Sequence, residues 1–262
     1  MIKFGGSVLN FNGSWFKKSV DRIPAWTLRL QFEDGVTPSI SAGTLYQRSI
    51  APNVWDWTNT SPDWSSCLQN QTSLKAVIGA GDLSGVTRMD FCFDHCYNMN
   101  EADFRNTDST ISTTSVDNFG NCFDFCTTLY SVRGLSFASC HEAYYMFNDC
   151  YCLGQYGSVG QDFDLTSVWG MPGMFRNCFY MQYLPQFTFN TTGQAGYGGM
   201  NCEKMFENCY KISFGALDLY NTMSTIPGFR YHTDTFKNCG RDTTIGAAEL
   251  QQIPASWGGL GA

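Results

Sequence analysis

Charged side chains are scarce in this chain, and cations are scarcer than anions. Lysine and arginine number 16 against 23 aspartates and glutamates, which gives a formal net charge of −7. A protein that binds nucleic acid carries a basic patch or stripe, but the longest basic run here is Lys17-Lys18. The composition therefore predicts that nucleic acid is not a partner.

Long apolar runs are also missing. No segment approaches the roughly 18 uninterrupted apolar residues of a membrane helix, so membrane insertion is not expected. The first residues, Met1 to Ser7, lack the apolar core of a secretory signal. We expect a chain that is made in the cytosol and not exported by that route, unless a signal has been trimmed from its start.

Histidine is scarce as well, with three copies at His95, His141 and His232. No nucleophile motif such as G-x-S-x-G accompanies them. Cys92-x-x-x-Cys96 and Cys150-x-Cys152 suggest zinc ligands, but the positions of Cys92 and Cys96 hold Met and Cys in other copies of a repeat. Methionine in place of cysteine indicates that these positions hold apolar core residues and not zinc ligands. We therefore expect a non-enzymatic protein with no catalytic residue, no metal site and no cofactor.

The chain is rich in aromatic residues, at 16%, and contains 12 cysteines. Six segments share the kernel aromatic-x-x-Cys: Phe93 to Cys96, Phe123 to Cys126, Phe147 to Cys150, Phe175 to Cys178, Phe206 to Cys209 and Phe236 to Cys239. Successive kernel cysteines lie 30, 24, 28, 31 and 30 positions apart. A sustained spacing of this size indicates an internal repeat.

Each kernel belongs to a longer apolar pattern. In the fourth copy the apolar residues are Met171, Met174, Phe175, Cys178 and Met181. Steps of three and four predict a short helical turn with one buried face, on which cysteine acts as a small hydrophobe. The period then changes to two, which predicts short strands at Ala102/Phe104, Leu135/Phe137, Phe163/Leu165, Phe187/Phe189 and Leu217/Leu219.

A helical turn plus a strand cannot bury its apolar stripe alone, so neighbouring copies must stack. The predicted fold class is an α/β repeat solenoid, leucine-rich-repeat-like, with short strands alternating with short helical turns, over residues 64–262. Residues 1–63 are predicted to form an N-terminal arm and a small β module, because residues 26–32 and 54–57 read as strands. A short helix at 247–253 and Trp257 are expected to cap the C-terminal end.

The kernel resembles the BspA-type leucine-rich repeat, most closely in Met174-Phe175-Arg176-Asn177-Cys178 and in Met205-Phe206-Glu207-Asn208-Cys209. The layout also resembles virion and tail-associated proteins of Bacteroidales phages, in residues 26–32, 55–57 and 252–257. This resemblance implies a virion component, tail-associated or fibre-like and assembled in the host cytoplasm, that serves host recognition or subunit contacts. Two alternatives remain: a bacterial adhesin at the cell surface, and a decoration subunit without a ligand.

Two sets of residues are candidate binding sites. By alternation, the outward strand face holds Asp103, Arg105, Ser136, Asp164, Thr188, Asp218 and Tyr220. We expect this strip to bind a host-surface glycan or protein, with a solvated face without ligand as the alternative. Turn tyrosines are expected to add flat surfaces for sugar rings or side chains, at Tyr151, Tyr180, Tyr183 and Tyr210.

The second set is apolar and lies near the start of the chain. This attachment arm comprises Phe4, Leu9, Phe11, Trp15 and Phe16, too many apolar groups for a loose tail. The arm is expected to dock on other virion proteins or on a second copy, which would place the chain in an oligomer or larger assembly. Packing of the arm on its own chain is the alternative.

Overall fold

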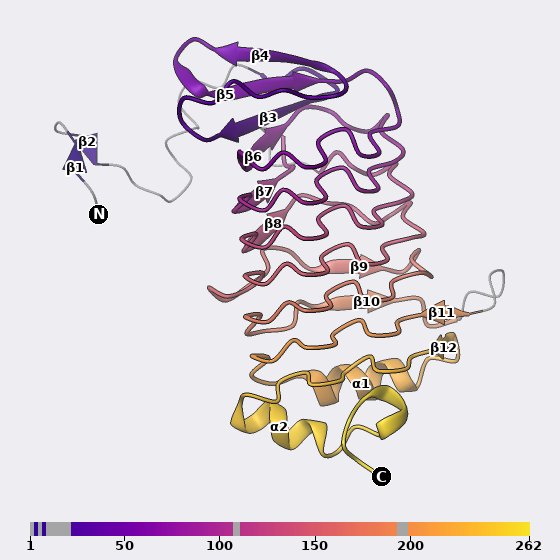
Figure 1. The fold of residues 1–262 in the computed structure, drawn as a ribbon. Coiled ribbons are helices and arrows are strands. Elements are labelled where there is room, and N and C mark those ends of the chain that lie inside the picture. Colours follow the sequence, from indigo (N-terminus) through magenta and orange to yellow (C-terminus); the bar gives the residue numbers. More distant parts are fainter. Residues whose placement is uncertain (1–2, 5–6, 9–21, 107–110, 193–198) are drawn as a thin grey trace.

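The computed structural model describes residues 3–4, 7–8, 22–106, 111–192 and 199–262 (Figure 1). At the N-terminal end, β1 (Lys3–Phe4) and β2 (Ser7–Val8) pair antiparallel. Strands β3 to β5 form the upper end of the body in Figure 1, and the helices α1 and α2 lie at the opposite end. Between them the chain runs back and forth in layers.

A six-stranded sheet joins the N-terminal strands to the first kernels. Its order is β4-β5-β3-β6-β7-β8, and its members are β3 (Thr27–Phe32), β4 (Thr44–Arg48), β5 (Ala51–Thr58), β6 (Leu74–Ala80), β7 (Glu101–Asp103) and β8 (Ser131–Arg133). The pairs among β3 to β6 are antiparallel, and β6, β7 and β8 are parallel. In β3, Leu28, Leu30 and Phe32 are buried, which confirms the strand predicted there. Since β3 pairs with β6, the sheet continues past residue 63.

The remaining strands form two small parallel pairs. They are β9 (Phe163–Leu165) with β10 (Phe187–Phe189), and β11 (Met200–Asn201) with β12 (Phe229–Tyr231). The helical elements are α1 (Ala216–Ser224), α2 (Thr244–Leu250) and the 3-10 turn η2 (Ala255–Trp257). None of the helices in the described part of the chain is long and apolar enough to span a membrane.

The prediction of an α/β repeat solenoid is wrong. Across the described ranges the α-helices are α1 and α2 alone, both beyond the fifth kernel, and the sheets mix parallel and antiparallel pairs. The segments expected to be helical turns are runs of tight turns instead. The structure is therefore mainly sheet and turn.

Left-handed residues explain why the kernels are not helical. Each kernel has two positions with positive φ, four residues apart, such as Gly173 (φ 60°) and Asn177 (φ 61°) in the fourth. A left-handed residue every four positions cannot be part of a right-handed α-helix. Instead the chain closes turns by bonds from N–H(i) to O(i−3), for example from Cys178 to Phe175 at 3.3 Å. The three- and four-residue apolar spacing survives, but a helix does not form.

Backbone hydrogen bonds also join each kernel to the next. Alternate residues donate forward, so that the Phe175 N–H bonds the Met205 carbonyl at 2.9 Å and the Asn177 N–H bonds the Glu207 carbonyl at 2.8 Å. Equivalent phenylalanine bonds join Phe93 to Cys122, Phe123 to Met146, Phe147 to Met174 and Phe206 to Thr235. The six kernels therefore lie side by side in register.

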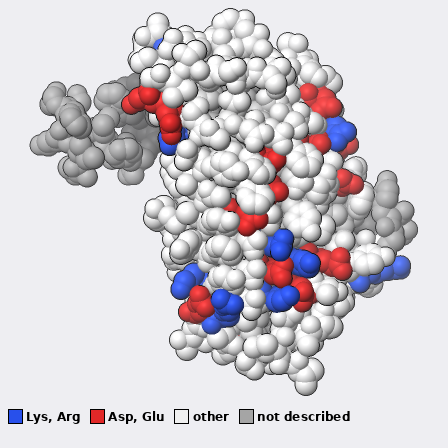
Figure 2. All heavy atoms as spheres, viewed as in Figure 1, with Lys and Arg blue, Asp and Glu red and all other residues white. Residues whose placement is uncertain are grey.

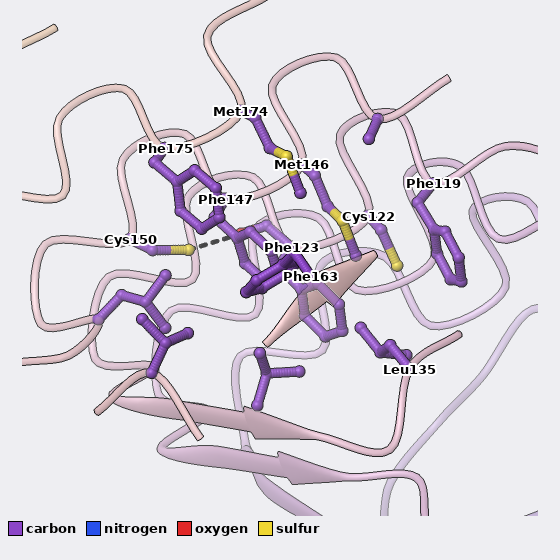
Figure 3. Packing of buried hydrophobic residues seen from close by; sticks show 14 of the residues in the cluster. Phe119, Cys122, Phe123, Leu135, Met146, Phe147, Cys150, Phe163, Met174 and Phe175 are labelled. Atoms are coloured by element: carbon purple, nitrogen blue, oxygen red, sulfur yellow. Dashed lines mark hydrogen bonds between the residues drawn. The ribbon is translucent and has the colours of Figure 1, made fainter. Parts of the chain in front are cut away.

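Stacked phenyl rings fill the interior along these kernels (Figure 3). The kernel rings are Phe93, Phe123, Phe147, Phe175, Phe206 and Phe236, and consecutive centroids lie 5.3, 5.4, 5.4, 5.6 and 5.8 Å apart with nearly parallel planes. Phe163 packs edge-on between two of them, at 6.1 Å from Phe147 and 5.3 Å from Phe175. Parallel-offset and edge-on pairs are the two favourable aromatic geometries. We call this set the phenyl stack.

The kernel cysteines form a second line beside the phenyl stack. The Cys150 Sγ donates to the Phe123 carbonyl at 3.0 Å (Figure 3), and the Cys126 Sγ donates to the Phe93 carbonyl at 3.1 Å. Burial raises the pKa of the Cys96 thiol to about 12, so this thiol remains protonated and able to donate. Among the residues that the structure describes, no cluster of His, Cys, Asp or Glu is arranged to hold a metal ion. The six thiols are apolar filling, and those of Cys96, Cys126, Cys150, Cys178 and Cys209 each donate one weak hydrogen bond to a backbone carbonyl.

The C-terminal end differs from the prediction in one element. Leu217 and Leu219 were expected to lie on a strand, but they lie in α1. The Glu249 carboxylate of α2 accepts hydrogen bonds from the backbone N–H groups of Gly215, Ala216 and Leu217 at 3.0, 2.8 and 3.3 Å. This carboxylate satisfies donors that a helix N-terminus leaves unpaired and complements its positive end. A short helix is present at the C-terminal end as predicted, but it spans Thr244–Leu250 and not residues 247–253. The Trp257 ring lies 6.3 Å from Phe236 and covers the last ring of the phenyl stack.

Removing the Glu249 carboxylate is expected to destabilise this end. Glu249→Ala leaves three backbone donors of α1 without their charged acceptor, so we expect the free energy of unfolding to fall by about 1–3 kcal/mol. Glu249→Gln keeps an acceptor oxygen and should lose less than half as much. Thermal and chemical denaturation of both variants measures this order. Equal losses in Ala and Gln variants would contradict the role of the carboxylate.

Candidate functional site

The predicted strand-face strip is only partly brought together. Asp103 in β7 forms an ion pair with Arg105, whose Nε donates to Oδ1 at 2.8 Å. Asp164 in β9 and Thr188 in β10 are register partners and both are exposed. Each pair is adjacent, but the two pairs belong to different sheets.

The other three strip residues do not lie on strands. Strand β8 ends at Arg133, so Ser136 lies beyond it, and the strand predicted at Leu135/Phe137 is wrong. Asp218 and Tyr220 lie in α1, where the Tyr220 ring packs edge-on against Trp257 at 5.5 Å. A continuous polar strip across all the strands is therefore not formed.

The tyrosines expected to offer flat surfaces differ from one another. Tyr151 and Tyr210 are members of a surface ring column in which Phe179 lies between them, at 4.8 and 5.2 Å. The Arg241 guanidinium covers the other face of Tyr210 at 3.9 Å. Because stacked neighbours occupy these faces, Tyr210 presents mainly its edge. Tyr180 and Tyr183, in contrast, are 51% and 42% exposed.

Most of the attachment arm lies outside the described residues. This applies to Leu9, Phe11, Trp15 and Phe16. Phe4 lies in β1, which pairs with β2. Docking of the arm on a partner therefore stays a prediction.

An open cleft of about 370 Å³ is lined by residues that precede the third to the sixth kernel. None of its lining residues belongs to the predicted strip. Its walls carry Glu142, Tyr144, Tyr145, Trp169, Asn201 and Tyr231. Gly170 and Pro172, which precede the fourth kernel, also line it. Glu142, Gly170 and Asn201 are joined in one row of parallel bridges, so the hollow lies where the middle member of that row has no side chain.

Two glycines hold the tyrosine rings of this cleft. A Cβ placed on Gly120 would lie 2.2 Å from the Tyr144 ring, and one on Gly173 would lie 2.4 Å from the Tyr145 ring. Each ring therefore lies directly over the backbone of a neighbouring kernel, where no other residue type leaves room. These glycines were a signal in the sequence, because Gly120 and Gly173 occupy the positions that Tyr144 and Tyr145 hold in the adjacent copy.

Besides tyrosine hydroxyls and the Trp169 indole, the cleft lining carries one carboxylate and one amide. The Glu142 Oε2 accepts from the Asn118 Nδ2 at 3.2 Å, and the Asn201 Oδ1 accepts from the Glu203 N–H at 3.0 Å. Within the described ranges no Lys or Arg pairs with Glu142. Burial raises the pKa of the Tyr144 hydroxyl, which keeps it a neutral donor. The cleft thus offers aromatic rings, an acceptor and a donor.

A ladder of polar side chains crosses the last four kernels at the residue before each cysteine. The Asn238 Nδ2 donates to Asn208 at 2.9 Å, Asn208 donates to Asn177 at 2.8 Å, and Asn177 donates to the Asp149 carboxylate at 3.0 Å. We call this the amide ladder. Nearer the N-terminus carboxylates replace the amides, and the Asn148 Nδ2 bridges Asp124 and Asp149 at 2.9 and 2.8 Å.

Burial of the Asp124 carboxylate makes stability depend on pH. Burial, with a further contribution from the charges of Asp94 and Asp149, raises the pKa of Asp124 from 3.8 to about 6. The folded state therefore binds this proton more tightly than the unfolded state does. The stabilisation is full below about pH 4 and is lost as the pH rises through about 6.

Asp124→Asn should remove this dependence, because the amide oxygen still accepts from Asn148 and carries no charge. At pH 7.5 we expect the variant to be more stable than the parent by about 1–2 kcal/mol after solvent screening is allowed for. The difference should vanish near pH 4. Thermal melts across this pH range measure it, with the exposed Asp34→Asn as control. A variant that keeps the parent's pH profile would contradict the assignment.

Comparison of the chain with known families, with curated proteins and with solved structures finds no match. The resemblance to the BspA-type repeat and to phage virion proteins therefore stays a prediction.

Proposed function

We propose that this chain is a non-enzymatic virion component, tail-associated or fibre-like, that presents a fixed surface for recognition of the host. The cleft is the observation that carries this proposal. Its lining residues come from the segments that precede four neighbouring kernels, through Glu142, Gly170, Asn201 and Tyr231. The backbone bonds between kernels fix their spacing before any ligand arrives, and such preorganisation favours binding.

The surface around the kernels favours recognition of a partner through direct contact over long-range electrostatic attraction. Figure 2 shows few Lys, Arg, Asp or Glu side chains on this face, and most of its area is uncharged. With a net charge of −7, the chain has little attraction for polyanions. The proposed partners are a host-surface glycan or protein at the cleft and other virion proteins at the N-terminal arm.

The location of the protein on a particle tests this proposal. Gold-labelled antibodies against the full chain, imaged on intact particles by electron cryotomography, should mark the distal end of the tail or its fibres. An internal position, or no label on any particle, would reject the proposal. Label over the whole capsid together with normal adsorption of particles lacking the chain would favour a decoration subunit. Label on uninfected bacterial cells would favour an adhesin.

A further inference from the structure

We propose that the cleft binds a neutral sugar ring with neighbouring hydroxyl groups, an inference that rests on the proposed recognition function. A sugar site first requires a flat apolar surface, and aromatic rings supply it because the apolar face of a pyranose packs on them. Tyr144, Tyr145 and Tyr231 line the cleft. The Tyr231 ring is 51% exposed, so it offers an open apolar surface to a flat ligand.

A sugar site also requires hydrogen-bonding partners for the hydroxyl groups, and Glu142 and Asn201 supply them. The Asn201 Oδ1 is engaged by the Glu203 N–H, which leaves the Nδ2 group as a donor. The Glu142 Oε2 accepts from Asn118, and its second oxygen remains an acceptor. Gly170, which has no side chain, lies between Glu142 and Asn201 in the row of bridges, so a sugar seated over it has an acceptor for a hydroxyl on one side and a donor to a hydroxyl on the other. An ammonium group has donors only and cannot use the amide donor.

Charge disfavours an acidic ligand. The lining includes Glu142 and no Lys or Arg, so a carboxylated or phosphorylated sugar would meet an unpaired negative charge. The aliphatic carbons of Arg230 lie 2.7 Å from a Cβ placed on Gly199, at one side of the lining. Weaker binding of an acidic sugar than of a neutral one is therefore expected.

The size of the cleft limits the ligand to a short unit. A volume of about 370 Å³ is at the lower end of small-ligand sites, which are about 300–1,000 Å³. Such a cleft holds one or two sugar rings and not a long chain. Affinity for a single ring is expected to be weak, with gain from several copies on one particle.

Saturation-transfer NMR and calorimetric titration of the full chain test the proposal. The probes are the methyl glycosides of glucose, galactose, mannose and N-acetylglucosamine, with glucuronate and tetramethylammonium for comparison. At least one neutral glycoside should bind. Asn201→Asp, which keeps the acceptor for Glu203 and loses the donor, should weaken binding by about tenfold or more. Tyr231→Ala removes a ring that is 51% exposed and should weaken it by about fivefold or more.

The matched control is Tyr156→Ala, at a tyrosine that is 79% exposed and outside the cleft, which should bind as the parent does. Circular dichroism of each variant establishes that it is folded. Equal binding by parent, Asn201→Asp and Tyr231→Ala would overturn the proposal. So would binding of tetramethylammonium or glucuronate with no binding of any neutral glycoside, or no binding of any probe. Labelled particles with no glycoside binding would reject the ligand and leave the virion role intact.

Discussion

Phe175→Ala is expected to lower the free energy of unfolding by about 3–5 kcal/mol, the largest effect of any single substitution considered. This ring is fully buried. It stacks on Phe147 and Phe206 at 5.4 and 5.6 Å, and it meets Phe163 and Phe187 edge-on at 5.3 and 5.9 Å. Its loss opens a cavity at the centre of the phenyl stack and breaks four aromatic contacts at once. Denaturation followed by fluorescence and circular dichroism together measures the change.

Two further variants separate ring stacking from simple burial. Phe175→Leu keeps an apolar side chain and should cost about 1–2 kcal/mol. Phe214→Ala removes a phenyl ring that is 54% exposed and should change stability by less than about 0.5 kcal/mol. If Phe175→Ala cost no more than Phe214→Ala, the phenyl stack would not be what holds the kernels together.

Asn208→Ala is expected to cost about 2–3 kcal/mol. The substitution removes two hydrogen bonds of the amide ladder, to Asn177 at 2.8 Å and from Asn238 at 2.9 Å, each worth about 1 kcal/mol. It also places alanine at a φ of 65°, a conformation that asparagine tolerates better than other residues with a Cβ. Chemical denaturation measures the sum of the two effects.

Asn208→Gly distinguishes these two causes. Glycine adopts the left-handed conformation without strain, so this variant loses the two hydrogen bonds alone and should be more stable than Asn208→Ala. The usual order is the reverse, since alanine ordinarily stabilises a chain relative to glycine. An alanine variant more stable than the glycine variant would show that the backbone conformation at this position carries no cost.

The interior could be predicted from the sequence because its spacing survives in the structure. Phenylalanine and cysteine recur in every kernel, and all twelve of these side chains are buried with no exposed area. The local backbone was harder to predict. Asn177 and Asn208 hint at left-handed positions, but Phe125 and Lys204 adopt the same φ with no such hint. An apolar step of three and four residues is common to a helix and to this run of turns, so periodicity alone could not separate them.

Long-range contacts account for the other differences. The alternation at Leu217 and Leu219 indicated a strand, but a carboxylate from Glu249, more than thirty residues along the chain, caps a helix there. The cleft was missed because it arises from absent side chains at Gly170 and Gly173 and from rings in the adjacent kernel. A search for polar residues on one strand face does not detect such a hollow. The proposed strip failed as a continuous surface because Ser136, Asp218 and Tyr220 lie outside the strands.

The ladders have a consequence for how such a molecule can change its length. The second, third and fourth kernels repeat the same ring and thiol contacts toward both neighbours, so the faces exposed by duplicating or deleting one of these units would match. The amide ladder limits where this works. A junction between Asn177 and Asn208 joins amide to amide, whereas a junction between Asp124 and Asp149 depends on the amide of Asn148 that bridges them. We therefore expect a change in the number of units to cost less beside Asn177 and Asn208 than beside Asp124 and Asp149.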